Sequence, residues 1–216
     1  MIDLLDDKDF LLQREGAHII AHLSFRYVDL VTKHILDPIR LPLLPSEKLV
    51  GKAECVVTSD ELVETTLKRL LTITSIPSPT LIATTLKPLL RNLFVLAAYT
   101  GSTPHAHIKA QVIQVLEKYT SSASSDDVLS LLDLLLSTSF SERWTYTAGG
   151  HGGVAIRRLS DNDSRELGLD EITARISVII EVLSTAPESV KSRTFVRIIR
   201  QWLSLNDEKP LEYGSR

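Results

Sequence analysis

The feature that most constrains this chain is a long apolar run, SPTLIATTLKPLLRNLFVLAAYTG, at residues 78–101. Ser78 is a favourable N-cap, Pro79 would stand at the first helical position, and Gly101 is placed to end the helix. The apolar residues cover more than one side of this helix, whereas a helix with one buried side shows a single apolar stripe. The run therefore predicts a central helix that is covered on two sides.

Four residues inside this run modify the prediction. Pro88 removes one backbone donor and clashes with the carbonyl group four residues back, so we expect a kink there. Lys87, Arg91 and Asn92 interrupt the apolar length that a membrane span requires. The run is therefore expected to be the core helix of a soluble fold, with no membrane span.

Helical spacing of apolar residues and N-cap signals predict further helices on both sides of the central one. They form helical pairs at about 9–36, 59–100, 103–136 and 170–205. The first pair is expected to end at Asp37, because the residue before a proline is pushed out of the helical region. The glycine-rich stretch 137–168 has no sustained period and predicts a long inserted loop.

The spacing of the predicted helices indicates a repeat. The starts near Ser59 and Thr103 lie about 44 residues apart, and those near Ser78 and Ser125 about 47, within the period of helical-pair repeats. The interval from the third predicted pair to the fourth is longer by about the length of the inserted loop, so leaving the loop out restores the period. We therefore expect one all-α domain over 1–216, an α-solenoid of about four stacked helical hairpins. This pattern resembles HEAT and armadillo repeats, and an irregular helical bundle is the alternative.

Charge and cysteine content exclude several classes of protein. With 24 basic and 27 acidic residues the net charge is -3, so the chain lacks the excess of positive charge that general nucleic-acid or membrane binding needs. Cys55 is the single cysteine, which precludes an internal disulfide and suits the cytosol or nucleus. The N-terminal MIDLLDDKDF carries acidic residues where a secretory signal needs a basic region.

Local motifs do not indicate catalysis or a metal site. His18 and His22 lie four residues apart on a predicted helix, but the glutamate of a HExxH motif is missing. The glycines at 149–153 could let backbone amides wrap an anion, but no GKS or GKT sequence accompanies them. No nucleophile elbow is present. We therefore expect no enzyme activity, no cofactor and no metal. An enzyme whose glycine loop closes over a pocket is a remote alternative.

Two regions carry candidate partner-binding residues. Arg157 and Arg158 precede Ser160 at the spacing of basophilic kinase substrates, so Ser160 is a candidate phosphosite in the predicted loop. The last predicted helix carries a basic stripe beside two aromatic residues, which can dock an acidic peptide or a nucleic-acid backbone. Aromatic and arginine residues are frequent energetic anchors of interfaces. The candidate partner-binding residues are Trp144, Tyr146, Arg157, Arg158, Arg193, Arg197 and Arg200.

Two segments, PLLRNLFVLAAYTGSTPHAHIKAQVIQVLEKY at 88–119 and GGHGGV at 149–154, resemble the transport and Golgi organisation protein 6 family and its fungal relatives. The resemblance lies in helix pattern and loop placement over about half the chain, and no site residues are transferred from it. It implies a fragment of a longer solenoid in the cytoplasm and nucleus, with RNA polymerase II subunits or assembly chaperones as partners.

The expected function is a non-catalytic helical-repeat scaffold or adaptor for protein–protein interaction, in nuclear transport or assembly of RNA polymerase II. The alternative is a nucleic-acid-binding helical-repeat protein that uses the basic helix face.

Overall fold

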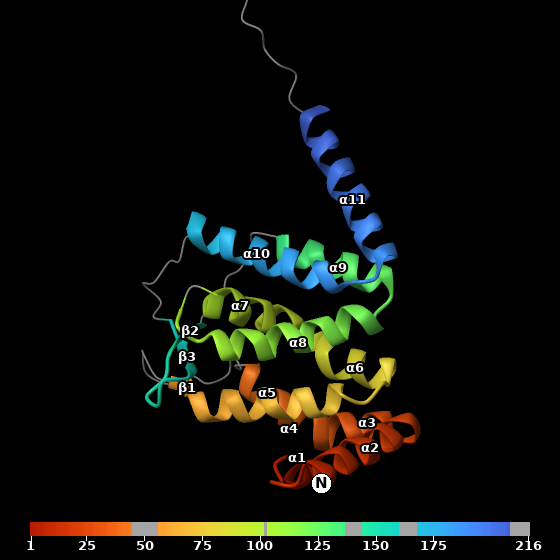
Figure 1. The fold of residues 1–216 in the computed structure, drawn as a ribbon, viewed down its shortest axis with the longest axis vertical. Coiled ribbons are helices and arrows are strands. Elements are labelled where there is room, and N and C mark those ends of the chain that lie inside the picture. The colour runs from red at the N-terminus through yellow and green to blue at the C-terminus, as the bar shows by residue number, and fades with distance from the viewer. Residues whose placement is uncertain (45–55, 102, 137–143, 160–167, 208–216) are drawn as a thin grey trace, which may run out of the picture.

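The computed structural model describes residues 1–44, 56–101, 103–136, 144–159 and 168–207, and it is mostly helical with one small sheet (Figure 1). The helices are α1 (Ile2–Leu5), α2 (Phe10–Arg26), α3 (Val28–Val31), α4 (Asp37–Arg40), α5 (Asp60–Thr74), α6 (Pro79–Leu86), α7 (Leu90–Gly101), α8 (Ala106–Ser122), α9 (Ser125–Leu136), α10 (Leu169–Thr185) and α11 (Glu188–Asp207). The strands are β1 (Val56–Thr58), β2 (Trp144–Ala148) and β3 (Val154–Arg158). The mostly helical character that the sequence predicts is confirmed.

The longer helices succeed one another along the molecule from the N-terminal to the C-terminal end (Figure 1). One series of contacts runs from α2 to α5, from α5 to α8 and from α8 to α10. A second series runs from α7 to α9 and from α9 to α11, and α7 also packs against α8 and α10. The central helix therefore has neighbours on more than one side, as its apolar pattern predicts.

The central run folds as α6 and α7, joined by one turn of 3-10 helix at Lys87–Leu89. The helix type thus changes at Pro88, the position at which the sequence predicts a kink. By length and composition, Pro79–Gly101 is the one candidate membrane span found among the described helices, yet 72% of its most apolar window is buried by the rest of the protein. Leu86, Leu89 and Leu93 are fully buried in the main core, which agrees with a core helix.

A buried arginine satisfies the backbone at this interruption. Pro88 has no N–H, so the carbonyl of Thr84, four residues earlier, lacks its usual helical donor. Arg40 of α4 donates a hydrogen bond from Nη1 to that carbonyl at 2.8 Å. The Arg40 side chain also pairs with the carboxylate of Asp37 and is almost completely buried. Arg40 thus completes the hydrogen bonding of a helix more than forty residues away in the sequence.

The predicted end of the first helical pair at Asp37 is wrong. The chain continues from α3 through a π-helical turn at Thr32–Leu36 directly into α4, which holds Pro38 in its first turn. A π turn widens the helix, so the proline enters where a missing N–H and a displaced carbonyl can be tolerated. The preference of pre-proline residues for extended backbone is overridden by this local widening, and Ile35, Leu36 and Ile39 enter the core.

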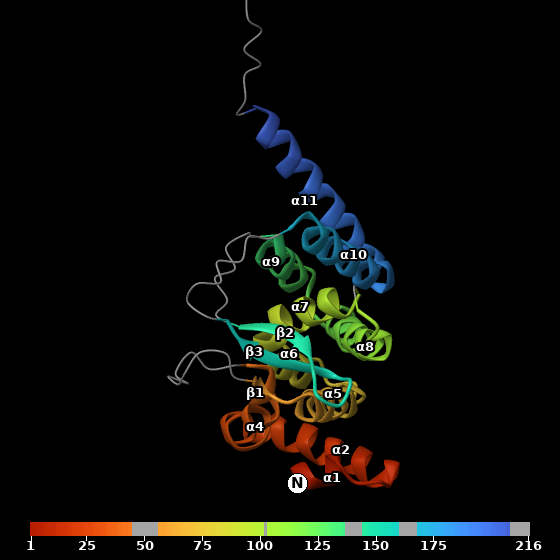
Figure 2. The ribbon, with the colours of Figure 1, turned by 90° about the vertical axis from the view of Figure 1, so that its left-hand side faces the viewer.

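The region 137–168, predicted to be an inserted loop, instead contributes two strands of an antiparallel sheet with the order β1-β3-β2 (Figure 2). Tyr146 pairs with Ile156 across β2 and β3, and Val56 of β1 pairs with Arg157. Val154, Ile156 and Tyr146 join the main core. The expectation of helices alone is therefore corrected: the hairpin is part of the packed structure. Residues 137–143 and 160–167 lie outside the described part of the chain, as does Cys55.

Candidate functional site

The glycine-rich turn between β2 and β3 wraps a carboxylate of the protein itself. Asp60, the first residue of α5, accepts hydrogen bonds at Oδ2 from the backbone nitrogens of His151 at 2.8 Å and Gly153 at 3.3 Å. The turn closes through a hydrogen bond from Gly149 N to Gly153 O at 2.8 Å. Two of the amides that the sequence offers to an external anion, those of His151 and Gly153, thus donate to Asp60.

This contact explains the need for two of the glycines. A Cβ at Gly149 would lie 2.4 Å from Asp60 side-chain atoms, and one at Gly153 would lie 2.8 Å from Asp60 Cβ. Gly152 adopts a φ of 85°, which side-chain-bearing residues rarely adopt. The hydrogen bond from His151 lowers the pKa of Asp60 below its usual 3.8, with smaller contributions from the Gly153 and Glu61 amides against the opposing effect of burial. The arrangement therefore holds Asp60 ionised and anchors the hairpin to α5.

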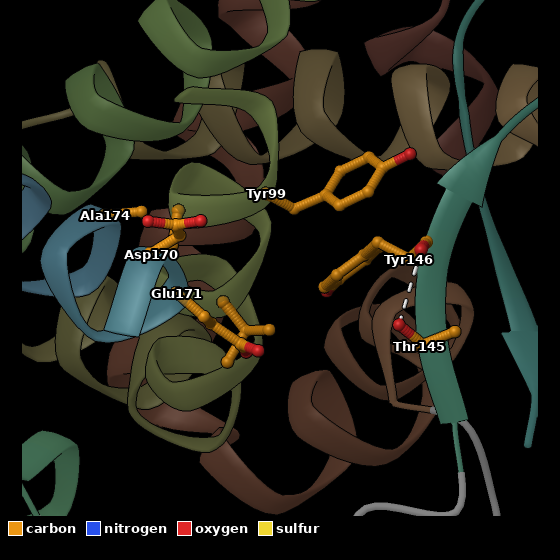
Figure 3. Close-up of a pocket in the computed structure, with 8 residues that line it drawn as sticks. Tyr99, Thr145, Tyr146, Asp170, Glu171 and Ala174 are labelled. Carbon is orange, nitrogen blue, oxygen red and sulfur yellow. Dashed lines mark hydrogen bonds between the residues drawn. The ribbon is translucent and has the colours of Figure 1, made fainter. Parts of the chain in front are cut away.

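A pocket of about 220 Å³ lies between α7, β2 and the start of α10. Figure 3 shows Asp170 and Glu171 of α10 across this pocket from Tyr146 of β2. Glu171 is paired with Arg175 at 2.7 Å, so the carboxylate charge at this side is partly balanced. The polar groups that line the pocket are carboxylates and hydroxyls, and no histidine or cysteine is among the described lining residues.

The predicted anchors of the hairpin lie in strands. Trp144 pairs with Arg158 across β2 and β3, and Arg157 pairs with Thr145. Trp144, Arg157 and Arg158 are half-buried. Tyr146 is only 4% exposed, and its hydroxyl donates to the backbone oxygen of Asn92 at 2.9 Å.

Tyr146, a candidate partner-binding residue by sequence, is therefore a core residue whose ring is covered by the protein itself. It contacts Trp144 edge to face with ring centroids 5.3 Å apart. Alternation of polar and apolar side chains around a glycine turn is the sequence signal of such a hairpin, and it could have revealed that Tyr146 faces inward. The candidate phosphosite Ser160 lies outside the described residues and stays a prediction.

The predicted arginine stripe lies on α11, the helix that projects away from the body of the molecule in both views (Figures 1 and 2). Arg193 and Arg200 are exposed and Arg197 is half-buried. Arg193 Nη1 lies 3.5 Å from the carboxylate of Asp126 at the start of α9, with both side chains largely in solvent. The structure thus keeps these three arginines on one helix, at the opposite end of the molecule from α1 and α2.

Beside the arginines, α11 exposes a broad apolar face. Val190 and Thr194 are buried on the side that meets the body, while six large apolar side chains are 40–67% exposed. They are Phe195, Val196, Ile198, Ile199, Trp202 and Leu203. The sequence pattern places the two aromatic residues of this face beside the arginines. It does not reveal that the face is exposed, because a buried and an exposed apolar stripe have the same periodicity.

The neighbouring helix α10 adds a second exposed apolar stripe. Ile172, Ile176 and Ile180 recur at four-residue spacing and are 37%, 45% and 63% exposed. Val178 and Val182, on the opposite side of the helix, are buried. The C-terminal end of the molecule therefore presents apolar side chains on two successive helices. We call these nine exposed residues of α10 and α11, together with Arg193 and Arg200, the C-terminal surface.

No family model matches this sequence, and comparison with curated proteins and with solved structures finds no significant match.

Proposed function

We propose that this chain is a non-catalytic helical-repeat scaffold that binds another protein through the C-terminal surface. The observation that carries the proposal is the exposure of six large apolar side chains on α11 beside arginines. Contiguous exposed apolar residues rimmed by polar ones are typical of protein interaction sites, and tryptophan and arginine are frequent energetic anchors there.

The proposed architecture is an α-solenoid, in which each helical pair stacks on the one before. The two series of contacts, α2 to α5 to α8 to α10 and α7 to α9 to α11, support this proposal because equivalent helices of successive repeats are neighbours in a solenoid. Apolar faces at the end of such a stack are the faces that a following helical layer would cover. The hairpin of β2 and β3 is then an insertion between the third and fourth pairs.

The proposal extends to the identity of the partner protein and to the cellular compartment in which the two meet. The resemblance to the transport and Golgi organisation protein 6 family makes RNA polymerase II subunits and their assembly chaperones the first partners to test, in the cytoplasm and nucleus. Among the described residues, Trp144, Arg157 and Arg158 are secondary candidates, because all three are half-buried in the sheet.

The test is affinity purification of the tagged chain from a eukaryotic extract, with mass spectrometry of retained proteins. The variant is Phe195→Ser with Trp202→Ser, which removes two aromatic side chains that are 67% and 60% exposed. The control is Phe10→Ser with Phe25→Ser on α2, where the side chains are 69% and 88% exposed.

Proteins lost from the α11 variant but retained by the α2 variant support the proposal. Equal retention by both variants, or no specific partner of the intact chain, overturns it. Circular dichroism of each variant establishes that the helices are intact.

Nucleic-acid binding is the second candidate, favoured by the alternation of arginines with Phe195 and Trp202 on α11. Aromatic rings stack on bases and arginines contact phosphates, so RNA or DNA binding would be strongly salt-dependent. Fluorescence anisotropy with single-stranded RNA and duplex DNA at low salt tests this directly. Absence of binding eliminates the candidate.

A further inference from the structure

We infer that the occupant of the C-terminal surface is an amphipathic helix of the partner protein that carries acidic residues along one flank. This inference rests on the proposed function and specifies the chemistry of the partner. It follows from three properties of the surface: the helical spacing of its apolar residues, the one-sided placement of its arginines, and the consequence of that placement for self-association.

The apolar residues have the spacing that receives a helix. Phe195, Ile199 and Trp202 lie at i, i+4 and i+7 and therefore fall on one side of α11. Ile172, Ile176 and Ile180 form a similar line on α10. An amphipathic helix presents its own apolar residues at this spacing, so its apolar face can cover the line on α11.

The charge of the surface is one-sided. Arg193 and Arg200 are seven residues apart, two helical turns, and lie along one border of the apolar face of α11. Arg193 has a single weak contact, 3.5 Å from Asp126, and Arg200 forms no ion pair with any residue in the described part of the chain. Both guanidinium groups are therefore accessible to carboxylates on an incoming helix. Such rim contacts set orientation and partner choice more than total affinity.

A second copy of this chain fits the surface poorly. Two α11 helices packed antiparallel on their apolar faces would place Arg193 of one copy near Arg200 of the other. Like charges at an interface oppose association, so self-pairing is disfavoured where an acidic helix is favoured. A purely apolar helix would offer no carboxylate to either arginine, and Arg193 would keep only its contact with Asp126. The charges thus select an acidic helix among the possible occupants.

The experiment uses three synthetic 18-residue peptides with blocked ends and the full chain. All three have the same leucine and phenylalanine content. The first has a glutamate flank, the second replaces each glutamate with lysine, and the third scrambles the first so that no apolar face forms. Binding is measured by fluorescence anisotropy at low and high salt.

The glutamate peptide is expected to bind about tenfold more tightly than the lysine peptide at low ionic strength, and salt is expected to narrow this ratio. The scrambled peptide is expected not to bind. Phe195→Ser with Trp202→Ser is expected to abolish binding of the glutamate peptide.

A charge swap makes the test specific. In Arg200→Glu, and more strongly in Arg193→Glu with Arg200→Glu, the preference is expected to reverse toward the lysine peptide. The matched control is Arg14→Glu with Arg26→Glu, two exposed arginines of α2 that change the net charge equally and must leave the preference unchanged.

The inference is overturned if the glutamate and lysine peptides bind equally, or if neither binds. It is also overturned if light scattering detects concentration-dependent dimers that the α11 variants abolish. Because the purification experiment does not depend on the partner's charge, a partner captured there together with peptides that fail here refutes the acidic helix alone. Failure of both experiments refutes the scaffold proposal as well.

Discussion

The carboxylate of Asp60 accepts a hydrogen bond from the backbone nitrogen of His151 at 2.8 Å, which joins positions 91 residues apart in the sequence. Gly153 donates to the same oxygen. A glycine-rich turn with inward-pointing amides is typical of an anion site, and here the anion is a side chain of the protein. The Asp60 carboxylate thus fills the anion site of the turn, and this contact holds the sheet against α5.

Removing the carboxylate should loosen this junction. In Asp60→Ala the amides of His151 and Gly153 lose their acceptor, whereas Asp60→Asn keeps one neutral oxygen. We expect the Tm to fall in the order wild type, Asp60→Asn, Asp60→Ala, as measured by circular dichroism. Glu15→Gln, a change at an exposed carboxylate of α2, is the control. An Asp60→Ala variant as stable as this control would contradict the assignment.

The glycines of the turn should differ in their tolerance of a methyl group. Gly149→Ala places Cβ 2.4 Å from Asp60 atoms and should lower the free energy of unfolding by about 1–3 kcal/mol. Gly150→Ala meets nothing within 4 Å and should change it by less than about 0.5 kcal/mol. Urea unfolding of both variants tests the difference. The cost of Gly149→Ala should shrink only in part in the Asp60→Ala background, because the carboxyl group is gone but the Cβ of residue 60, also 2.4 Å away, remains.

Acid should weaken the same contact. The His151 amide lowers the pKa of Asp60 in the folded chain, so the carboxylate stabilises the fold fully above the unfolded pKa near 3.8. That contribution is lost as pH falls below 3.8 through the lowered pKa. The stability difference between wild type and Asp60→Asn should therefore be constant from neutral pH to about pH 5 and should narrow below 3.8. Urea midpoints across this range give the result, and a difference that widened on acidification would refute it.

Arg40 and Pro88 should be energetically coupled through the carbonyl of Thr84. Arg40→Leu leaves that part-buried carbonyl without its donor and should cost about 1–3 kcal/mol. In the Pro88→Ala background a new backbone N–H can reach the same oxygen, so the cost should be smaller by at least about 0.5 kcal/mol. A double-mutant cycle from urea unfolding measures the coupling. Strict additivity of the two changes would show that the proline does not create the need for the arginine.

Tyr146 should contribute to stability and not to partner binding. Tyr146→Phe removes the hydroxyl that donates to the Asn92 oxygen and should cost about 0.5–1.5 kcal/mol. The proteins retained in affinity purification should be unchanged, in contrast to those lost from the α11 variant. Loss of a partner from a stably folded Tyr146→Phe chain would return this residue to the binding surface.

Local signals in the sequence account for much of the helical structure. Ser59 and Ser125 mark the starts of α5 and α9 closely, and Pro88 coincides with the break between α6 and α7. The rule that a residue before proline leaves the helical region failed at Pro38. A π-helical turn precedes this proline, and the chain stays helical through it. The effect of proline depends on the preceding turn, which the pattern of residues does not reveal.

The sheet and its anchor were harder to foresee for a different reason. β2 and β3 have five residues each, and β1 has three, so their periodicity is short compared with that of the helices. Their stability comes from pairing and from the contact with Asp60, which connects distant positions and leaves no local pattern. The arginines and aromatic residues of α11 could be predicted as a candidate site, because their spacing lies within one helix.

The link between Asp60 and the glycine turn also orders events during synthesis. Chains emerge from the ribosome N-terminal end first, and α5 through α9 precede the hairpin. Until residues 151 and 153 have emerged, the Asp60 carboxylate must be hydrated by water, and the space that Val154 and Ile156 fill stays open. The N-terminal two thirds of the chain can therefore form helices while nascent, but its core closes only when the hairpin arrives.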